Sequence, residues 1–143
     1  MWAVKLPSAA PSWVQTGMTT ILLVDDEDLL REGVQEILEH NGYTVVQAST
    51  GHAALQYLAQ ASVSLVISDL VMPEMNGVDF VRQVRERFPD LPIIVASGST
   101  GAVMARMGID SIGVPGATAS LMKPFRSADL LAQVRQVLSE AAP

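Results

Sequence analysis

The stretch TTILLVDD (19–26) decides the fold of this chain. Residues 21–24 are apolar without alternation, which is typical of a strand covered on both faces in a parallel sheet, and the run ends on two acids. Aliphatic runs of similar length follow along the chain, at 43–48, 63–68, 91–97 and 118–122. The sequence therefore predicts five strands of one parallel sheet, the first of them within 19–26.

Amphipathic segments separate these runs, and their apolar residues recur at helical spacing. The segment 28–40 places Leu30, Val34 and Leu38 on one face and is followed by Asn41-Gly42, a common helix stop. Further helices are predicted at 51–60, at 77–88, at 102–107 and from Ser127 onward. This alternation of strands and helices predicts an α/β fold, doubly wound, with helices on both faces of the sheet.

Length and composition limit the classes to which the chain can belong. With 143 residues, 49% of them hydrophobic, it is expected to form one domain, at 19–141, preceded by a flexible N-terminal tail at 1–18. A net charge of −6 argues against direct binding of nucleic acid, which needs clustered Lys and Arg. The absence of cysteine excludes disulfides and thiolate metal sites, and no apolar run is long enough to span a membrane. A cytoplasmic location is expected by default.

Polar residues follow the predicted strands at the end where ligands bind in an open α/β sheet. Asp25 and Asp26 end the first strand, Asp69 the third, Ser97 the fourth, and Lys123 follows the fifth. Since the carboxyl ends of parallel strands meet at one edge, four separate segments are expected to converge there. Each residue alone has a plainer explanation, such as helix capping for the acidic pair or a turn for Asp69, but together they indicate a site.

Three carboxylates in one crevice repel each other unless a cation lies among them, and oxygen ligands without His or Cys suit Mg²⁺. Mg²⁺ commonly completes its coordination with a phosphate, one oxygen of which Lys123 can hold while the hydroxyl of Ser97 donates to another. Asp69 stands alone at its strand end, so it is the natural nucleophile for a phosphoryl group, and Asp25 and Asp26 are better placed to hold the ion.

These motifs resemble the receiver domains of two-component response regulators, the CheY-like family: VDDE (24–27), DLVMPEMNG (69–77), a hydroxyl at Ser97 and LMKPF (121–125). The resemblance covers about 19–140. It implies a flavodoxin-like (βα)5 fold with strand order 2-1-3-4-5. It also implies phosphorylation of Asp69 by a histidine kinase or phosphotransfer protein, in a phosphoacceptor domain that is not an enzyme, although it assists its own phosphotransfer and dephosphorylation.

The resemblance further implies that Asp26, Asp69 and the backbone carbonyl of Val71 bind Mg²⁺ directly, with Asp25 acting through a water. Ser97 and Lys123 would contact the phosphoryl oxygens, and the Lys123-Pro124 bond would be cis. Phosphorylation would then change the surface formed by the fourth helix, the fifth strand and the fifth helix. A homodimer or an effector domain or protein would use that surface.

The chain departs from the family's usual pattern at several positions. Ser120 stands where most members carry an aromatic switch residue, and the segment 97–116 is a few residues longer than usual, so the output surface is expected to differ. Val71 cannot orient an attacking water and Ser99 is small, which predicts slow loss of the phosphoryl group. These departures leave open an alternative, a pseudo-receiver that signals by protein interaction without phosphorylation. The sequence does not name the kinase or the output.

Overall fold

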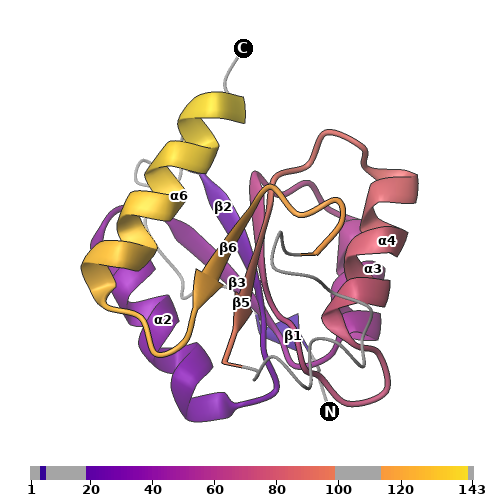
Figure 1. The fold of residues 1–143 in the computed structure, drawn as a ribbon, viewed down its shortest axis with the longest axis horizontal. Coiled ribbons are helices and arrows are strands. Elements are labelled where there is room, and N and C mark those ends of the chain that lie inside the picture. Colours follow the sequence, from indigo (N-terminus) through magenta and orange to yellow (C-terminus); the bar gives the residue numbers. More distant parts are fainter. Residues whose placement is uncertain (1–3, 6–18, 99–113, 142–143) are drawn as a thin grey trace.

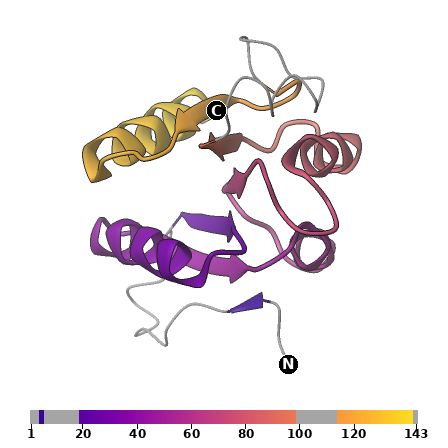
Figure 2. The same ribbon diagram turned by 60° about the horizontal axis from the view of Figure 1, so that its bottom comes forward.

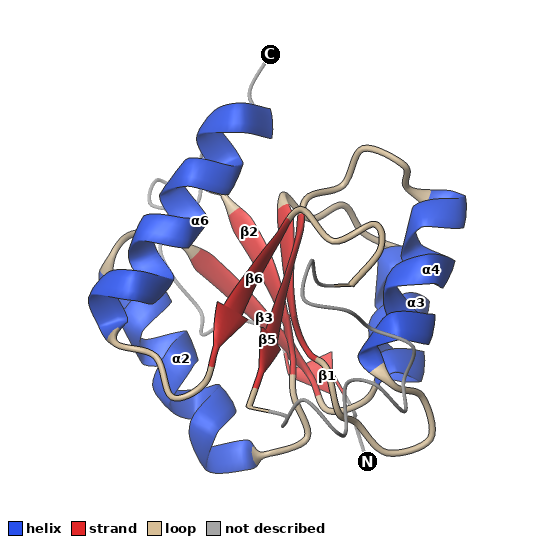
Figure 3. Cartoon of the chain, viewed as in Figure 1, coloured by secondary structure: helices blue, strands red, loops and turns tan. Residues whose placement is uncertain are grey.

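The computed structural model describes residues 4–5, 19–98 and 114–141 (Figures 1 and 3). Within these residues the strands are β1 (Val4–Lys5), β2 (Thr20–Val24), β3 (Thr44–Ala48), β4 (Leu65–Asp69), β5 (Ile93–Ser97) and β6 (Ala119–Met122). The helices are α2 (Asp28–His40), α3 (Gly51–Leu58), α4 (Gly77–Arg87) and α6 (Ser127–Ala141). The helix predicted at 102–107 lies outside the described residues.

All six strands form one sheet in the order β1-β3-β2-β4-β5-β6. The strands from β2 to β6 are parallel, and β1 alone pairs antiparallel, with β3. For the five strands that the sequence predicted, this is the expected order 2-1-3-4-5, so the fold prediction is confirmed. The parallel order brings the carboxyl ends of β2, β4, β5 and β6 to one edge of the sheet.

Helices cover both faces of the sheet, with α2 and α6 on one side and α3 and α4 on the other (Figure 2). Each face has its own apolar cluster: Leu22 and Val66 point toward α3 and α4, whereas Ile21 and Ile67 point toward α2 and α6. The central strands are buried on both faces, with Ile21, Leu22 and Val24 at 0% exposure. This double burial explains the uninterrupted apolar runs in the sequence.

The ends of the helices are fixed by residues that can be read in the sequence. Thr50 accepts a hydrogen bond from the Ala53 amide at 3.0 Å and begins α3, and Asn76 accepts one from the Asp79 amide at 2.9 Å and begins α4. After α2 the chain turns at Gly42, whose φ of +92° lies in the left-handed region that glycine tolerates. These residues thus mark where α2 ends and where α3 and α4 begin.

Strand β1 was not predicted, because the sequence analysis assigned Val4 and Lys5 to a flexible tail. The structure instead pairs Val4 with Ala48 and Lys5 with Gln47 at the outer edge of β3. Val4 packs against the apolar cluster under α3 and α4, and Lys5 forms an exposed ion pair with Glu32 on α2, with 3.8 Å between Nζ and Oε1. Two residues are too few to show a strand periodicity. The other residues of 1–18 lie outside the described residues.

The side chain of Arg85 on α4 binds the segment that leads into β6. Arg85 donates from Nε to the carbonyl of Gly116 at 2.8 Å and from Nη2 to the hydroxyl of Thr118 at 3.3 Å. The same guanidinium donates to the carbonyl of Leu91, at the entrance to β5. Arg85 therefore joins α4 to the segments that lead into both strands at this edge of the sheet.

Candidate functional site

Three of the predicted residues meet at the carboxyl edge of the sheet. The ammonium of Lys123, after β6, lies 3.3 Å from Oδ2 of Asp25 and 3.2 Å from Oδ1 of Asp69. The residues Asp25 and Asp69 are 6% and 8% exposed, respectively, and come from the ends of β2 and β4. Segments 98 residues apart in the sequence thus meet in one charged cluster. The predicted convergence is confirmed for these three residues.

Asp69 is the last residue of β4, and its Cα pairs in register with Ala96 of β5. Burial raises the pKa of Asp69 above its ordinary value of 3.8; Lys123 acts in the opposite direction, and Asp25 adds to the rise. Its backbone carbonyl accepts a hydrogen bond from the hydroxyl of Ser68 at 2.9 Å. Asp69 is therefore a buried carboxylate, held at a strand end with one side chain cation beside it.

Lys123 completes this arrangement. Its burial acts to lower its pKa, but the charges of Asp69 and Asp25 and the hydrogen bonds to both outweigh that effect, so the pKa of Lys123 is raised above 10.5. Its backbone amide donates to the carbonyl of Ser97 at 2.9 Å, and the peptide bond from Lys123 to Pro124 is cis, as predicted. The ammonium thus stays protonated and neutralises part of the charge of the two acids.

Ser97 lies at the end of β5, half-buried, with its Cα paired to that of Met122. This register places Ser97 beside the residue that precedes Lys123, at the edge where the sequence analysis expected it. Ser120, on the exposed side of β6, is paired with Val95. The position where most family members carry an aromatic residue is thus held here by an exposed serine.

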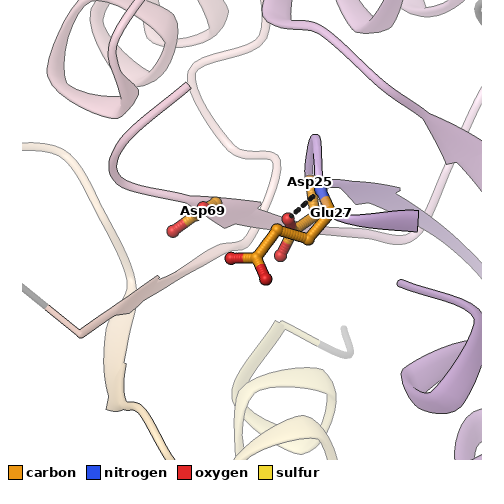
Figure 4. A group of neighbouring side chains, drawn as sticks. All are labelled: Asp25, Glu27 and Asp69. Carbon is orange, nitrogen blue, oxygen red and sulfur yellow. Dashed lines mark hydrogen bonds between the residues drawn. The ribbon is translucent and has the colours of Figure 1, made fainter. Parts of the chain in front are cut away.

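The loop between β2 and α2 carries the acids. The amide of Asp25 donates to the carbonyl of Ala48 at 3.2 Å, and the Asp25 carboxylate accepts from the amide of Glu27 at 2.9 Å. Asp25, Glu27 and Asp69 bring one carboxylate oxygen each within 4.8 Å of one another (Figure 4). Asp26, predicted as a direct ligand, is exposed, and among the described residues it is not part of that group. Glu27 was not among the predicted ligands; its one signal in the sequence is its place in VDDE (24–27).

The loop between β4 and α4 is closed tightly behind Asp69. The amide of Gly77 donates to the carbonyl of Leu70 at 2.6 Å, and Met75 is buried in the apolar cluster. Glu74 has a φ of +68°, in the left-handed region. Val71, two residues after Asp69, is 51% exposed. The loop therefore fixes the backbone around the position whose carbonyl was predicted to bind the ion.

Comparison with known proteins agrees with this geometry. A model of the response regulator receiver domain family matches residues 21–135, which is most of the chain. The chain is a response regulator receiver domain. The motifs that suggested the family, from the acids after β2 to Lys123 after β6, all lie inside the matched range.

Relatives and solved structures show how far the likeness extends. The response regulator MprA of Mycolicibacterium vanbaalenii is 36% identical over 123 residues, which are 86% of this chain and 52% of the relative. The sensor kinase CckA of Brucella abortus is 35% identical over 127 residues, which are 87% of this chain and 13% of the relative. This receiver domain thus spans about half, or much less, of the length of these relatives.

Among solved structures, the chemotaxis response regulator CheY4 of Vibrio cholerae superposes with a TM-score of 0.72 at 34% identity, covering 84% of this chain and 98% of that one. A CheY-like receiver domain protein from Methanospirillum hungatei gives a TM-score of 0.76 at 26% identity, covering 87% and 97%. Among the residues that the structure of this receiver domain describes, no helix is both long and apolar enough to cross a membrane.

Proposed function

We propose that this receiver domain is a phosphorylation switch in which Asp69 accepts a phosphoryl group from a histidine kinase or phosphotransfer protein. The observation that carries the proposal is the contact of one ammonium, that of Lys123, with the carboxylates of Asp25 and Asp69 at the carboxyl edge of the sheet. Buried charges of this kind are costly to maintain for stability alone, and they gather at functional sites.

The residues present fit a Mg²⁺ ion. The donors at the pocket are carboxylate and carbonyl oxygens without His or Cys, which suits a hard cation. Asp25, Glu27 and Asp69 bring their carboxylates together there and would hold the ion. The resemblance to the family adds Asp26 and the carbonyl of Val71 as further ligands. When bound, Mg²⁺ supplies charge neutralisation for the incoming phosphoryl oxygens.

The chain's own groups account for the transfer. An oxygen of Asp69 forms the new bond to phosphorus as the bond from phosphorus to the donor's imidazole nitrogen breaks, and the imidazole keeps that electron pair. The ammonium of Lys123, 3.2 Å from Oδ1 of Asp69, is placed to hold an oxygen of the transferred group. Ser97, at the neighbouring strand end, would donate its hydroxyl to another oxygen. The product is an acyl phosphate on Asp69.

The domain would act as a phosphoacceptor and not as an enzyme with a separate substrate, although its own residues assist both phosphotransfer and dephosphorylation. Rearrangement at Ser97 and Lys123 would alter the surface of β6 and α6, where an effector domain or protein, or a second copy, would bind. The fourth helix, predicted at 102–107 as part of this surface, lies outside the described residues. A cytoplasmic location belongs to the same proposal, as expected of a domain that takes its phosphoryl group from a kinase.

Mass spectrometry of the intact chain after treatment with acetyl phosphate and Mg²⁺ tests the proposal. We expect an adduct of one phosphoryl group in the wild type and in Asp90→Asn, an exposed acid away from the pocket, and none in Asp69→Asn. No adduct in the wild type, under conditions that label a CheY-type receiver, would favour the alternative in which the domain signals by protein interaction without phosphorylation. An adduct that persists in Asp69→Asn would place the phosphoacceptor elsewhere.

A further inference from the structure

Arg31 is a buried cation directly beneath the acidic loop. Its residue exposure is 9%, and the other buried polar or charged side chains among the described residues are Asp25, Gln47, Ser68 and Asp69. A guanidinium out of water is costly unless its donors are satisfied, so the position of Arg31 in the first turns of α2 requires defined partners. Arg31 takes no part in the phosphotransfer proposed for Asp69, Lys123 and Ser97.

Three donors of Arg31 reach three different partners. Nη1 donates to the backbone carbonyl of Asp25 at 2.6 Å, Nε to the side chain of Gln47 at 2.8 Å, and Nη2 to the carboxylate of Asp28 at 2.7 Å. Gln47 is itself 1% exposed and donates to the side chain of Gln35. Because Gln47 and Asp28 fix the plane of the guanidinium, its direction toward the carbonyl of Asp25 is fixed as well.

The bond to Asp25 acts on the peptide that carries the acids. The amide of Asp25 is held by the carbonyl of Ala48, its carboxylate by Glu27 and Lys123, and its carbonyl by Arg31. That carbonyl belongs to the peptide between Asp25 and Asp26. Rotation of this peptide would displace the residues that follow it, including Glu27, whose carboxylate lies in one group with those of Asp25 and Asp69. The residues from 25 to 27 lie outside any helix or strand that could hold them in place.

We propose that Arg31 is a positioning residue of the cation site: its guanidinium holds the Asp25 peptide so that the acidic loop presents its carboxylates to Mg²⁺. This inference rests on the proposed function. The positioning role of Arg31 and its positive charge have opposite effects on Mg²⁺ affinity, because a nearby positive charge alone repels the cation. Removing Arg31 would strengthen Mg²⁺ binding if charge dominated, and it weakens binding if positioning dominates.

Isothermal titration with Mg²⁺ on the full chain, well below each variant's melting temperature, separates these effects. Loss of a group that orients metal ligands commonly weakens metal binding about 10–100-fold, and we expect a loss of this size in both Arg31→Lys and Arg31→Met. Arg31→Lys keeps the charge but lacks the planar fork that reaches three partners. The control Val134→Ala, buried on α6 within the same apolar cluster as Val34, should melt at a lower temperature but bind Mg²⁺ as the wild type does.

A second readout needs no metal. In the Mg²⁺-free protein the amide of Glu27 donates to the carboxylate of Asp25, so its proton should exchange slowly in the wild type and in Val134→Ala, and faster in Arg31→Lys. If Arg31→Met does not fold, Gln47→Met takes its place, because it removes the acceptor that orients Nε of Arg31, and it should weaken Mg²⁺ binding in the same direction.

Unchanged affinity in the Arg31 and Gln47 variants, or tighter binding in Arg31→Met, would overturn the inference while leaving the proposed function standing. No Mg²⁺ binding by the unsubstituted protein would overturn both, which distinguishes the two failures. Weaker binding in the Arg31 variants with an unchanged Val134→Ala supports the positioning role.

Discussion

Gly77 occupies a position where the methyl group of an alanine should strain the fold and weaken the function of this receiver domain. A Cβ added there would lie 2.7 Å from the Cα of Leu70 and 2.8 Å from the carbonyl oxygen of Asp69, whereas ordinary contacts begin near 3.4 Å. Both neighbours are backbone atoms, so no side chain can swing aside. Gly77→Ala must therefore push α4 away from the end of β4.

The cost can be estimated from two terms. Overpacking of a tight interior contact costs about 1–3 kcal/mol. The hydrogen bond from the amide of Gly77 to the carbonyl of Leu70, now 2.6 Å, would lengthen, and the loss of one hydrogen bond adds about 1 kcal/mol. Gly77→Ala should thus lower the free energy of unfolding by about 2–4 kcal/mol and the melting temperature by roughly 10 °C.

Gly33→Ala is the matched control, since Gly33 lies within α2 and a Cβ there would meet nothing within 4 Å. The same substitution at that position should raise the free energy of unfolding by about 0.5–1 kcal/mol, because alanine loses less backbone freedom in a helix than glycine. Urea denaturation followed by circular dichroism measures both variants, and the difference between them should be about 2.5–5 kcal/mol.

The displacement should also reach the pocket. The added Cβ would clash with the backbone of Asp69 and Leu70. Mg²⁺ binding and phosphorylation by acetyl phosphate should therefore weaken in Gly77→Ala and stay unchanged in Gly33→Ala. Equal stability of the two alanine variants, within about 0.5 kcal/mol, would refute the reasoning from contact distances.

Three further outcomes are expected. In Lys123→Met, the pKa of Asp69 should rise further, because burial already raises it and Lys123 opposes the rise. A carboxyl group with a raised pKa binds protons more tightly in the folded state, so the free energy of unfolding should fall as the pH increases above about 4, more steeply than in the wild type. A urea midpoint that stays constant between pH 4 and 7 would contradict this. The acyl phosphate should decay slowly in the wild type and faster in Val71→Gln, whose amide can orient an attacking water beside Asp69; equal decay rates measured by mass spectrometry after removal of the donor would count against that role. Glu74→Asn should raise the free energy of unfolding by about 0.5–1 kcal/mol, since asparagine tolerates a positive φ better than glutamate, and an unchanged urea midpoint would show that the turn carries no such strain.

The fold was predictable because its strands are buried on both faces. Ile21 and Leu22 have no exposed surface although they point to opposite sides of the sheet, and only a strand between two helical layers requires apolar residues at both positions. The convergence of Asp25, Asp69 and Lys123 followed from the same rule, since parallel strands end at one edge.

Side-chain positions in the acidic loop were not predictable in this way. Asp26 and Glu27 are neighbours in an irregular segment, and which of the two carboxylates lies near Asp69 depends on the backbone turn after Asp25. Arg31 was not predicted to matter, because an arginine in an amphipathic helix is usually solvated. Its burial depends on Gln47, which lies sixteen residues further along the chain, on strand β3.

Strand β1 has a consequence for how this protein is best produced and handled. The family match begins at residue 21, so a shorter chain cut to that boundary would lose Val4 and Lys5 and leave the backbone of Gln47 and Ala48 open along the rim of the sheet. An open rim of this kind is a template for pairing with another molecule. Such a truncated chain should self-associate on concentration more than the full chain does, a difference that light scattering would register.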